Sequence, residues 1–482
     1  VPSVSSKDAR MSVSSFYITV RDGTRLAADL YLPDPLPSGG HLPTLLEQTR
    51  YWRSSEMRGP LGWFQPRAGT TLSYDRRRKQ WWTAQGFAYL AVDVRGTGAS
   101  FGIHRYPWEP VTLDDAYDVL DWITRQPWSD GQAAGLGISY MGSTAELLLA
   151  TGHPSLKAVI PQFNHPDPFV NIAFPGGMYN QRFIKAWGEM DENLDLNRTP
   201  PSFGKIINLM PTSVRPVGGK AGPSDLEAAL QDHQKNIRVH HLDASEIAFR
   251  DALHPEGGFR SDDSALVQFY DRLRASPVPV YRRASWMDAG TAAAALRRFN
   301  DSAGPQRVII GAWNHGGVQQ SSPYQQDKAP ISPPHQVTRL DMLHFLKNAF
   351  YNPQDLPEHQ LVYYTLGSET WQTSATWPPV GVRCQRWYFS AERSLSPSRP
   401  VEAGTDRFSV DFRASSGIYN RWWELGVAKG QPVQYSDRGA QQDYVLAYQS
   451  PPLEHDLEIA GSPVLTLWVN CSLPDCAFFA YL

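Results

Sequence analysis

A serine in a glycine-rich segment is the first feature of this chain that could do chemistry. Residues 135–142 read GLGISYMG, with Ser139 between Gly137 and Gly142. An apolar run precedes the serine and helix-forming residues follow it, which predicts a strand, a sharp turn and a helix, as in a nucleophile elbow. The spacing is Gly-x-Ser-x-x-Gly and not the commoner Gly-x-Ser-x-Gly. A glycine-rich turn with a solvated serine is therefore the alternative interpretation.

Two further residues, Asp288 and His315, could activate that serine. A serine hydroxyl needs a base to take its proton, and the base needs an acid that fixes its tautomer. Asp288 follows a predicted strand at 278–281, and His315 follows another at 307–310. Alone, each would be an ordinary loop residue. In chain order, however, Ser139, Asp288 and His315 match the catalytic residues of α/β-hydrolases, so the pattern predicts a Ser-His-Asp triad.

Alternating strand and helix patterns surround these three residues and predict a mainly parallel sheet. Apolar and polar residues alternate on both sides of an Asp-Gly turn within residues 14–32, which indicates a β-hairpin. Residues 87–94 form a nearly continuous apolar run, typical of a strand buried on both faces. The glycine-rich loop after it resembles a dinucleotide fingerprint, but Pro107 and Pro110 prevent the helix that would hold a pyrophosphate.

Changes in periodicity divide the chain into three regions. Residues 1–167 and 278–355 carry the α/β pattern of a hydrolase core. Residues 168–277 contain Gly/Pro clusters between helical runs, which predicts an inserted, mostly helical cap. From residue 361 to 482 the periodicity changes to two, which predicts a C-terminal β-sandwich. Its strands are expected at 361–366, 387–389, 407–412, 443–448 and 464–469.

The composition excludes several classes of protein. The 482 residues carry a formal net charge of -3, which leaves no basic field for nucleic acid. No apolar run approaches the ~20 residues of a membrane-spanning helix. We therefore expect a soluble protein that binds neither nucleic acid nor membrane, with the cytoplasm slightly favoured over secretion. The three cysteines come without the spacing of a metal site. Hydrolysis by a Ser-His-Asp triad implies no metal and no cofactor, so none is expected.

Motifs spread over nearly the whole chain resemble those of the CocE/NonD hydrolases, relatives of cocaine esterase, α-amino acid ester hydrolases and X-Pro dipeptidyl peptidases. The motifs are RDGTRLAADLYLP at 21–33, DVRGTGAS at 93–100, DAYD at 115–118, QPWSDG at 126–131, GISYMG at 137–142 and PPLEHD at 451–456. The resemblance implies an α/β-hydrolase core, a helical cap and a C-terminal jelly roll. The unusual elbow spacing then supports a nucleophile elbow, because Gly-x-Ser-Tyr-x-Gly is the form found in this family.

The resemblance also implies a role for each candidate site residue. Ser139 would be the nucleophile, His315 the general base and Asp288 the acid that orients it. The backbone N–H of Tyr140 and the phenolic hydroxyl of Tyr51 would form the oxyanion hole. Without the family, Tyr51 would be interpreted as an ordinary aromatic residue at the end of a strand.

The sequence departs from the family pattern in two places. The jelly roll of the family usually continues beyond the segment that matches residues 465–482, so we expect the sequence in hand to be incomplete. Met141 stands where the amino acid ester hydrolases carry an acidic residue in the elbow. That substitution argues against a specificity for amino acid esters.

The sequence therefore predicts a serine hydrolase that cleaves carboxylic ester or amide bonds of a small molecule through an acyl-enzyme on Ser139. The alternatives are an X-Pro dipeptidyl peptidase, an α-amino acid ester hydrolase or acylase, and a binding protein on a retained hydrolase fold. The peptidase needs an acidic site for a free N-terminus. Acidic side chains do occur in the cap, but a solvated charged face is the favoured interpretation of them. They are Glu189, Asp191, Glu192 and Asp195. Three tryptophans are candidate pocket walls, with simple packing as the commoner role: Trp52, Trp187 and Trp286.

Overall fold

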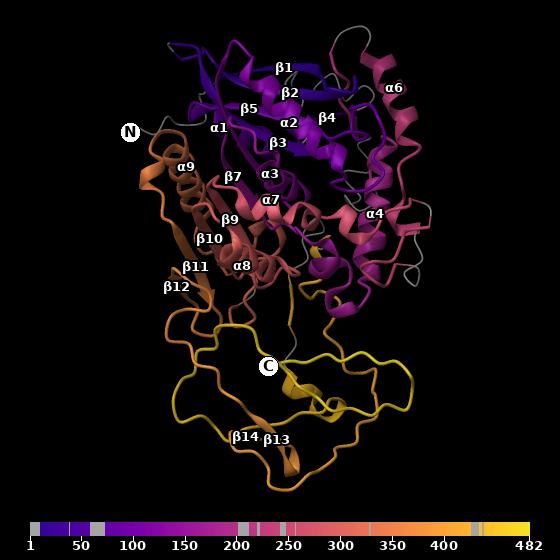
Figure 1. Cartoon of the computed structure of the whole chain (residues 1–482), viewed down its shortest axis with the longest axis vertical. Coiled ribbons are helices and arrows are strands. Elements are labelled where there is room, and N and C mark those ends of the chain that lie inside the picture. Colours follow the sequence, from indigo (N-terminus) through magenta and orange to yellow (C-terminus); the bar gives the residue numbers. More distant parts are fainter. Residues whose placement is uncertain are drawn as a thin grey trace.

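A ten-stranded sheet organises the protein, as the computed structural model shows (Figure 1). The structure describes residues 10–37, 39–57, 73–200, 212–218, 222–241, 247–255, 257–326, 329–425, 433–435 and 438–482. The strand order is β1-β2-β5-β3-β6-β7-β9-β10-β11-β12, and the seven neighbours from β5 to β11 run parallel to one another. The bounds are β1 Arg10–Thr19, β2 Arg25–Asp34, β3 Leu42–Thr49, β5 Ala88–Asp93, β6 Ser129–Ile138, β7 Leu156–Gln162, β9 Val280–Ser285, β10 Gln306–Gly311, β11 His359–Thr365 and β12 Thr370–Ser374.

Strand β5 shows why the apolar runs of this sequence form a doubly covered sheet. Successive side chains of a strand point to opposite faces, and those of β5 enter two different hydrophobic clusters. Leu90 and Val92 pack on one face against α2 (Pro110–Thr124) and α3 (Tyr140–Thr151). Tyr89 and Ala91 pack on the other face against α1 (Ser73–Ala84) and α9 (His335–Tyr351). Helix α8 (Thr291–Asp301) covers β10 and β11 on the face that carries α2 and α3. The predicted α/β architecture is thus confirmed.

A buried ion cluster ties the elbow helix α3 to the elements beside it. Glu146 of α3 is fully buried, and its two carboxylate oxygens lie 2.9 Å from Arg282 of β9 and 2.9 Å from Arg298 of α8. Asn164 donates a further hydrogen bond to Glu146, at 2.7 Å. Burial opposes ionisation of Glu146, but the two guanidinium groups prevail and lower its pKa to about 2.

The described part of the segment between β7 and β9 is mainly helical, and its helices α4 and α6 lie at the right of Figure 1. Its longest helix is α4 (Gln181–Asp195), and α6 (Gly222–His233) and α7 (Tyr270–Ala275) follow. A short strand, β8 (Thr212–Val214), pairs with β4 (Ser55–Met57), which lies outside the cap segment. Shorter helical turns complete the segment: η2 Phe169–Ala173, η3 Pro175–Gly177, η5 Val239–His241, η6 Ser261–Ser264 and η7 Leu266–Phe269.

The C-terminal region differs from the expectation. The predicted strand at 361–366 pairs in parallel with β10 and belongs to the main sheet, not to a sandwich. Of the other predicted strands, the one at 387–389 is found as β13 (Tyr388–Ser390), paired with β14 (Ser394–Ser396). The predictions at 407–412, 443–448 and 464–469 are wrong for this structure, in which these residues form no strand. An alternating pattern predicts which face of a strand is apolar, but a strand also needs a partner strand to satisfy its backbone groups, and no strand pairs with these three described segments.

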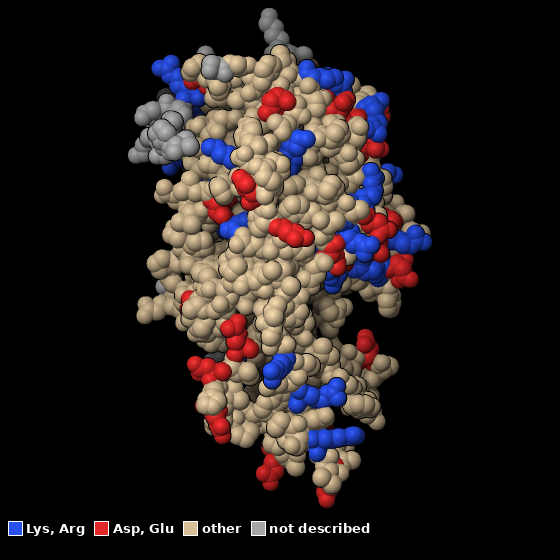
Figure 2. Space-filling model, turned by 60° about the vertical axis from the view of Figure 1, so that its left-hand side comes forward, with Lys and Arg blue, Asp and Glu red and all other residues tan. Residues whose placement is uncertain are grey.

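Charged side chains of both signs are interspersed on the face of the molecule shown in Figure 2. No large area of this face carries a single sign, in keeping with the small net charge of -3. This face therefore offers no basic stripe of the kind that tracks a nucleic-acid backbone.

Candidate active site

Ser139 lies at the junction of β6 and α3 in a strained conformation. Its backbone has φ 62° and ψ -123°, which is rare for a residue other than glycine and costs about 1–3 kcal/mol. The N–H of Ser139 donates to the carbonyl of Gln162 on β7 at 2.8 Å, and its carbonyl accepts from the N–H of Ser143 at 3.0 Å. The serine is therefore held by the neighbouring strand and by the first turn of the helix. This strand–turn–helix geometry is the one predicted for the elbow.

The two glycines that flank Ser139 lie where the backbone leaves no room for a side chain. A Cβ on Gly137 would lie 2.2 Å from the carbonyl oxygen of Met141, and one on Gly142 would lie 2.7 Å from the carbonyl oxygen of Gln162. Both distances are far inside van der Waals contact with backbone atoms, which cannot move aside. The Gly-x-Ser-x-x-Gly spacing is thus what allows the helix to pack closely on β6 and β7.

Asp288 and His315 are brought together at the carboxyl ends of β9 and β10. Nδ1 of His315 lies 3.0 Å from each carboxylate oxygen of Asp288, and Asp288 is only 1% exposed. The hydroxyl of Ser285 joins the two loops, since it donates to the carbonyl of Trp313 at 2.6 Å and accepts from the N–H groups of Trp313 and Met287. Burial lowers the pKa of His315, but the Asp288 carboxylate outweighs it, and the pKa rises to about 9.

His315 and Ser139 lie on adjacent parts of this sheet edge. A Cβ on Gly316 would be 4.0 Å from Cγ2 of Ile138, the residue before the serine. Gln162 accepts a hydrogen bond from the N–H of Ser139. The ring of Phe163, the next residue, lies 6.2 Å from the His315 ring, centroid to centroid. Among the described residues His315 forms hydrogen bonds with Asp288 and none with Ser139. Catalytic hydrogen bonds of this kind are often long in the absence of substrate.

Tyr51 and Tyr140 lie next to each other beside the elbow. Their ring centroids are 5.9 Å apart, and the indole N–H of Trp187 donates to the Tyr51 hydroxyl at 3.0 Å. Burial, and after it the charge of Asp191, raises the pKa of Tyr51 far above its usual value, so the phenol stays protonated. Because its oxygen accepts from Trp187, its proton is free to be donated elsewhere. Tyr140 begins α3, so its backbone N–H is one of the donors that a helix start leaves without an intrahelical partner.

The other two candidate wall residues have packing roles. Trp52 donates its indole N–H to the carbonyl of Leu194 at 3.1 Å. Trp286 donates to the carbonyl of Tyr364 at 2.7 Å and packs against Trp377. Among the hydrogen bonds of the described residues, the one from Trp187 to Tyr51 joins one of these tryptophans to a candidate site residue.

Two cap acids contradict the expected solvated face. Asp191 and Asp195 are 4% and 2% exposed and both face Arg50, at 3.0 and 3.4 Å. Arg50 follows β3 directly and lies over the ring of Trp187, 5.3 Å from its centroid. Burial, opposed by Arg50, raises the pKa of Asp191 well above its ordinary value. Asp191 and Asp195 are four residues apart and so share one face of α4. The spacing of these two acids in the sequence indicates that shared face. Their partner Arg50 lies 145 residues before Asp195, so no local pattern reveals the ion pair.

A buried carboxyl group next to Asp288 was not predicted at all. Oε1 of Glu424, in the C-terminal region, lies 2.7 Å from Nε2 of His165 and 3.6 Å from Nδ1 of His315. Glu424 is 4% exposed. It belongs to none of the sequence motifs, so only the structure could place it beside the candidate acid.

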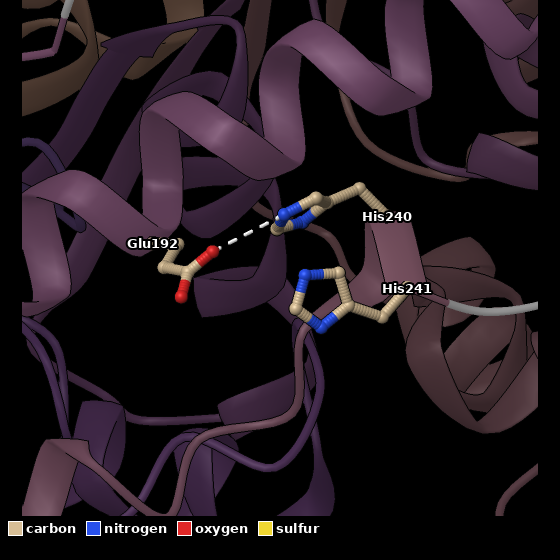
Figure 3. Close-up of side chains that lie close together, drawn as sticks. All are labelled: Glu192, His240 and His241. Atoms are coloured by element: carbon tan, nitrogen blue, oxygen red, sulfur yellow. Dashed lines mark ion pairs between the residues drawn. The ribbon is translucent and has the colours of Figure 1, made fainter.

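Among the residues that the structure describes, two groups of side chains have the donor atoms to hold a divalent cation. Glu192, His240 and His241 form one group in the cap (Figure 3), and Asp288, His315 and Glu424 form the other. Within each group the ligand atoms lie within 4.8 Å of one another. In the first, Glu192 already pairs with His240 at 3.2 Å and with Arg238 at 3.5 Å, so a cation would have to compete with a guanidinium group. In the second, a cation would compete with the hydrogen bond between His315 and Asp288.

The chain matches two known protein families. Residues 22–317 match the family described as X-Pro dipeptidyl-peptidase (S15 family), and residues 355–482 match the X-Pro dipeptidyl-peptidase C-terminal non-catalytic domain. A Mycobacterium bovis protein named "Putative serine esterase" is 36% identical over 98% of this chain and 78% of its own length. Cocaine esterase of a Rhodococcus species is 25% identical over 98% of this chain and 80% of its own.

Solved structures show the same fold at low sequence identity. A CocE/NonD family hydrolase from Staphylococcus aureus has a TM-score of 0.53 at 16% identity, and the match covers 81% of this chain and 60% of that one. An α-amino acid ester hydrolase has a TM-score of 0.57 at 20% identity, covering 84% of this chain and 66% of that one.

The fold and the site together define a serine hydrolase with an α/β-hydrolase core, a helical cap and a C-terminal non-catalytic domain. The chain belongs to the S15 family, and its relatives include the CocE/NonD hydrolases. In the part of the chain that the structure describes, no helix is long and apolar enough to span a bilayer.

Proposed function

We propose that this chain hydrolyses a carboxylic ester of a small molecule, with Ser139 as nucleophile, His315 as general base and Asp288 as the acid that orients it. The observation that carries the proposal is the pairing of a strained elbow serine with a buried His–Asp couple at the same sheet edge. The esterase names of two relatives favour an ester as substrate.

The reaction follows the two halves of acyl transfer. Nε2 of His315 takes the proton of the Ser139 hydroxyl as the serine oxygen attacks the substrate carbonyl carbon. The negative charge on the carbonyl oxygen is stabilised by the N–H of Tyr140 and the hydroxyl of Tyr51. The intermediate collapses, the C–O bond to the leaving group breaks, and His315 returns the proton to the leaving alcohol.

Deacylation repeats these steps with water. His315 removes a proton from a water molecule, the water oxygen attacks the acyl carbon, and the second tetrahedral intermediate collapses to release the acid. His315 then returns the proton to Ser139. Asp288 keeps the Nδ1 proton of His315 in place and stabilises the imidazolium that forms in each half, without taking the proton itself.

The surroundings of the cap acids favour a simple ester over a substrate with a free amino group. A pocket for an ammonium group needs a carboxylate with uncompensated charge, whereas both Asp191 and Asp195 face Arg50. Met141 adds no charge in the elbow. X-Pro dipeptides and amino acid esters are therefore the second candidates, and a binding protein without catalysis is the third.

Labelling with a fluorophosphonate probe tests the proposal. We expect mass spectrometry of the digested protein to place the label on Ser139, and Ser139→Ala to lose hydrolysis of p-nitrophenyl acetate and butyrate. Ser398→Ala, in an exposed part of the C-terminal region, is the matched control and should behave as the parent. A Ser139→Ala protein that keeps the parent rate would exclude the mechanism. Hydrolysis of amino acid esters or X-Pro anilides at a higher kcat/KM than the acyl esters would favour the second candidates.

A further inference from the structure

Residues 421–425 of the C-terminal region are docked against the loop that carries Asp288. The carbonyl of Arg421 accepts from the N–H of Ala289, the residue after Asp288, at 2.9 Å. The carbonyl of Trp422 accepts from the side-chain amide of Asn180 at 3.1 Å. The side chains of Trp422 and Leu425 join an apolar cluster with the cap residues Ile172 and Phe183 and with Ala289. The segment is thus fixed to both the core and the cap.

This docking buries the carboxyl group of Glu424 among the groups behind the His–Asp pair. Its side chain is 2% exposed. The titratable groups that face it are His165 at 2.7 Å, His315 at 3.6 Å and Asp288, whose carboxylate lies within 4.8 Å of the other ligand atoms. His165 comes from the loop after β7, so the four residues belong to four separate segments of the chain.

The charge states of Glu424 and His165 follow from their burial. Two carboxylates in contact in a buried site cannot both ionise without a large cost, so one holds a proton. Burial, and after it the charge of Asp288, raises the pKa of Glu424 well above its ordinary value, although His315 opposes the change. Burial lowers the pKa of His165 to about 4, so its imidazole is neutral near pH 7. Asp288, Glu424 and His165 together then carry one negative charge, on Asp288.

We propose that Glu424 is a positioning residue of the active site: as a neutral carboxylic acid it donates a hydrogen bond to Asp288 and accepts one from Nε2–H of His165. This inference rests on the proposed function of Ser139, Asp288 and His315. The hydrogen bond holds the Asp288 carboxylate in place beside His315, and the C-terminal region thereby completes the active site.

The neutral state of Glu424 affects the protonation of His315, the proposed general base. A second carboxylate 3.6 Å from Nδ1 would add to the attraction of Asp288 for the imidazolium and hold His315 protonated. A protonated imidazole cannot accept the serine proton. A neutral acid supplies the hydrogen bond without the second charge, so His315 can still lose its proton in the working pH range.

Three variants of the whole chain test the proposal, with the pH profile of kcat/KM as the main readout. Glu424→Gln retains a donor, an acceptor and the neutral state, so we expect kcat within about twofold of the parent and an acid limb shifted by no more than a few tenths of a pH unit. Glu424→Ala removes both hydrogen bonds, so we expect kcat to fall about 10- to 100-fold with little change in KM, because Asp288 and His315 lose their alignment. Glu402→Gln changes an exposed carboxylate elsewhere in the C-terminal region and should leave kcat and the pH profile unchanged.

Each outcome has a definite meaning. An acid limb that moves down by about one unit or more in Glu424→Gln would show that Glu424 is ionised in the parent, which overturns the proposal. A parental kcat in Glu424→Ala overturns it as well. If Glu424→Ala has a lower melting temperature, a measurement well below its midpoint separates lost alignment from unfolding. The parent and Ser139→Ala are assayed beside these variants, so failure of the proposed function appears as activity independent of Ser139.

Discussion

Replacing Tyr51 by phenylalanine removes one hydroxyl and leaves the ring in place. The ring packs edge-on against Tyr140, with centroids 5.9 Å apart, and those contacts do not involve the hydroxyl oxygen. The hydroxyl of Tyr51 accepts from the indole of Trp187 and keeps its own proton for donation. The variant therefore isolates the proposed oxyanion contact from packing.

The expected loss is large and falls on kcat. An oxyanion donor is worth about 2.7–4 kcal/mol, which is a factor of about 10²–10³ in kcat, with KM little changed because the contact strengthens in the transition state. The variant also leaves the N–H of Trp187 without its acceptor, at a cost of about 1–3 kcal/mol in the free energy of unfolding if no other acceptor replaces it. Steady-state kinetics on p-nitrophenyl esters measure the first effect, and urea denaturation measures the second.

Two control variants separate the contributions. Trp187→Phe removes the same hydrogen bond from the other side but leaves the phenol, so its kcat should fall much less than that of Tyr51→Phe. Tyr179→Phe removes a hydroxyl from a half-buried cap tyrosine and should keep the parental rate. A Tyr51→Phe enzyme with kcat within twofold of the parent would refute the assignment of Tyr51 to the oxyanion hole.

Three further predictions follow from the core and the triad. The neighbours of His315 raise its pKa to about 9, and only the neutral imidazole accepts a proton, so kcat/KM should rise with pH along an acid limb whose midpoint lies above pH 6.5. A midpoint below pH 6.5 would contradict this. Replacing the orienting acid in Asp288→Asn should lower kcat by about 10⁴. Gly137→Ala should give little folded protein on expression, because its Cβ would meet a backbone oxygen at 2.2 Å, and a normal melting curve would count against the steric argument. Glu146 has a pKa of about 2 when folded against 4.5 unfolded, so it contributes roughly 3 kcal/mol above pH 4.5 that is lost as the pH falls toward 2. Denaturation at pH 7 and pH 3 should show this loss in the parent and much less of it in Glu146→Gln.

The candidate active site was predictable wherever the signal was local. Ser139, Asp288 and His315 each follow an apolar strand, and the carboxyl ends of parallel strands meet at one sheet edge. Their placement therefore follows from short stretches of sequence, while their catalytic roles stay a prediction. Glu424 and its partner His165 are 259 residues apart, and no local pattern specifies such a pairing.

The fold was predictable in its core and less so at its C-terminal end. Continuous apolar runs predicted the central strands because burial on both faces leaves a strong compositional signal. The strand at 361–366 was placed in the wrong layer, since the same pattern suits a sheet edge and a sandwich equally well. Asp191 and Asp195 were expected to be solvated because a charged helix face usually is, whereas Arg50, far away in the sequence, allows their burial.

The ion cluster around Glu146 has a consequence for how such an enzyme can diversify. It joins α3, which follows Ser139, to β9, which precedes Asp288, and to α8, which follows Asp288. The described helices of the cap, from η2 to α7, supply neither Glu146 nor its two arginine partners. Evolution or an engineer could therefore exchange much of the cap, and with it the range of accepted substrates, while a buried ion cluster of the core keeps the spacing of the candidate catalytic groups.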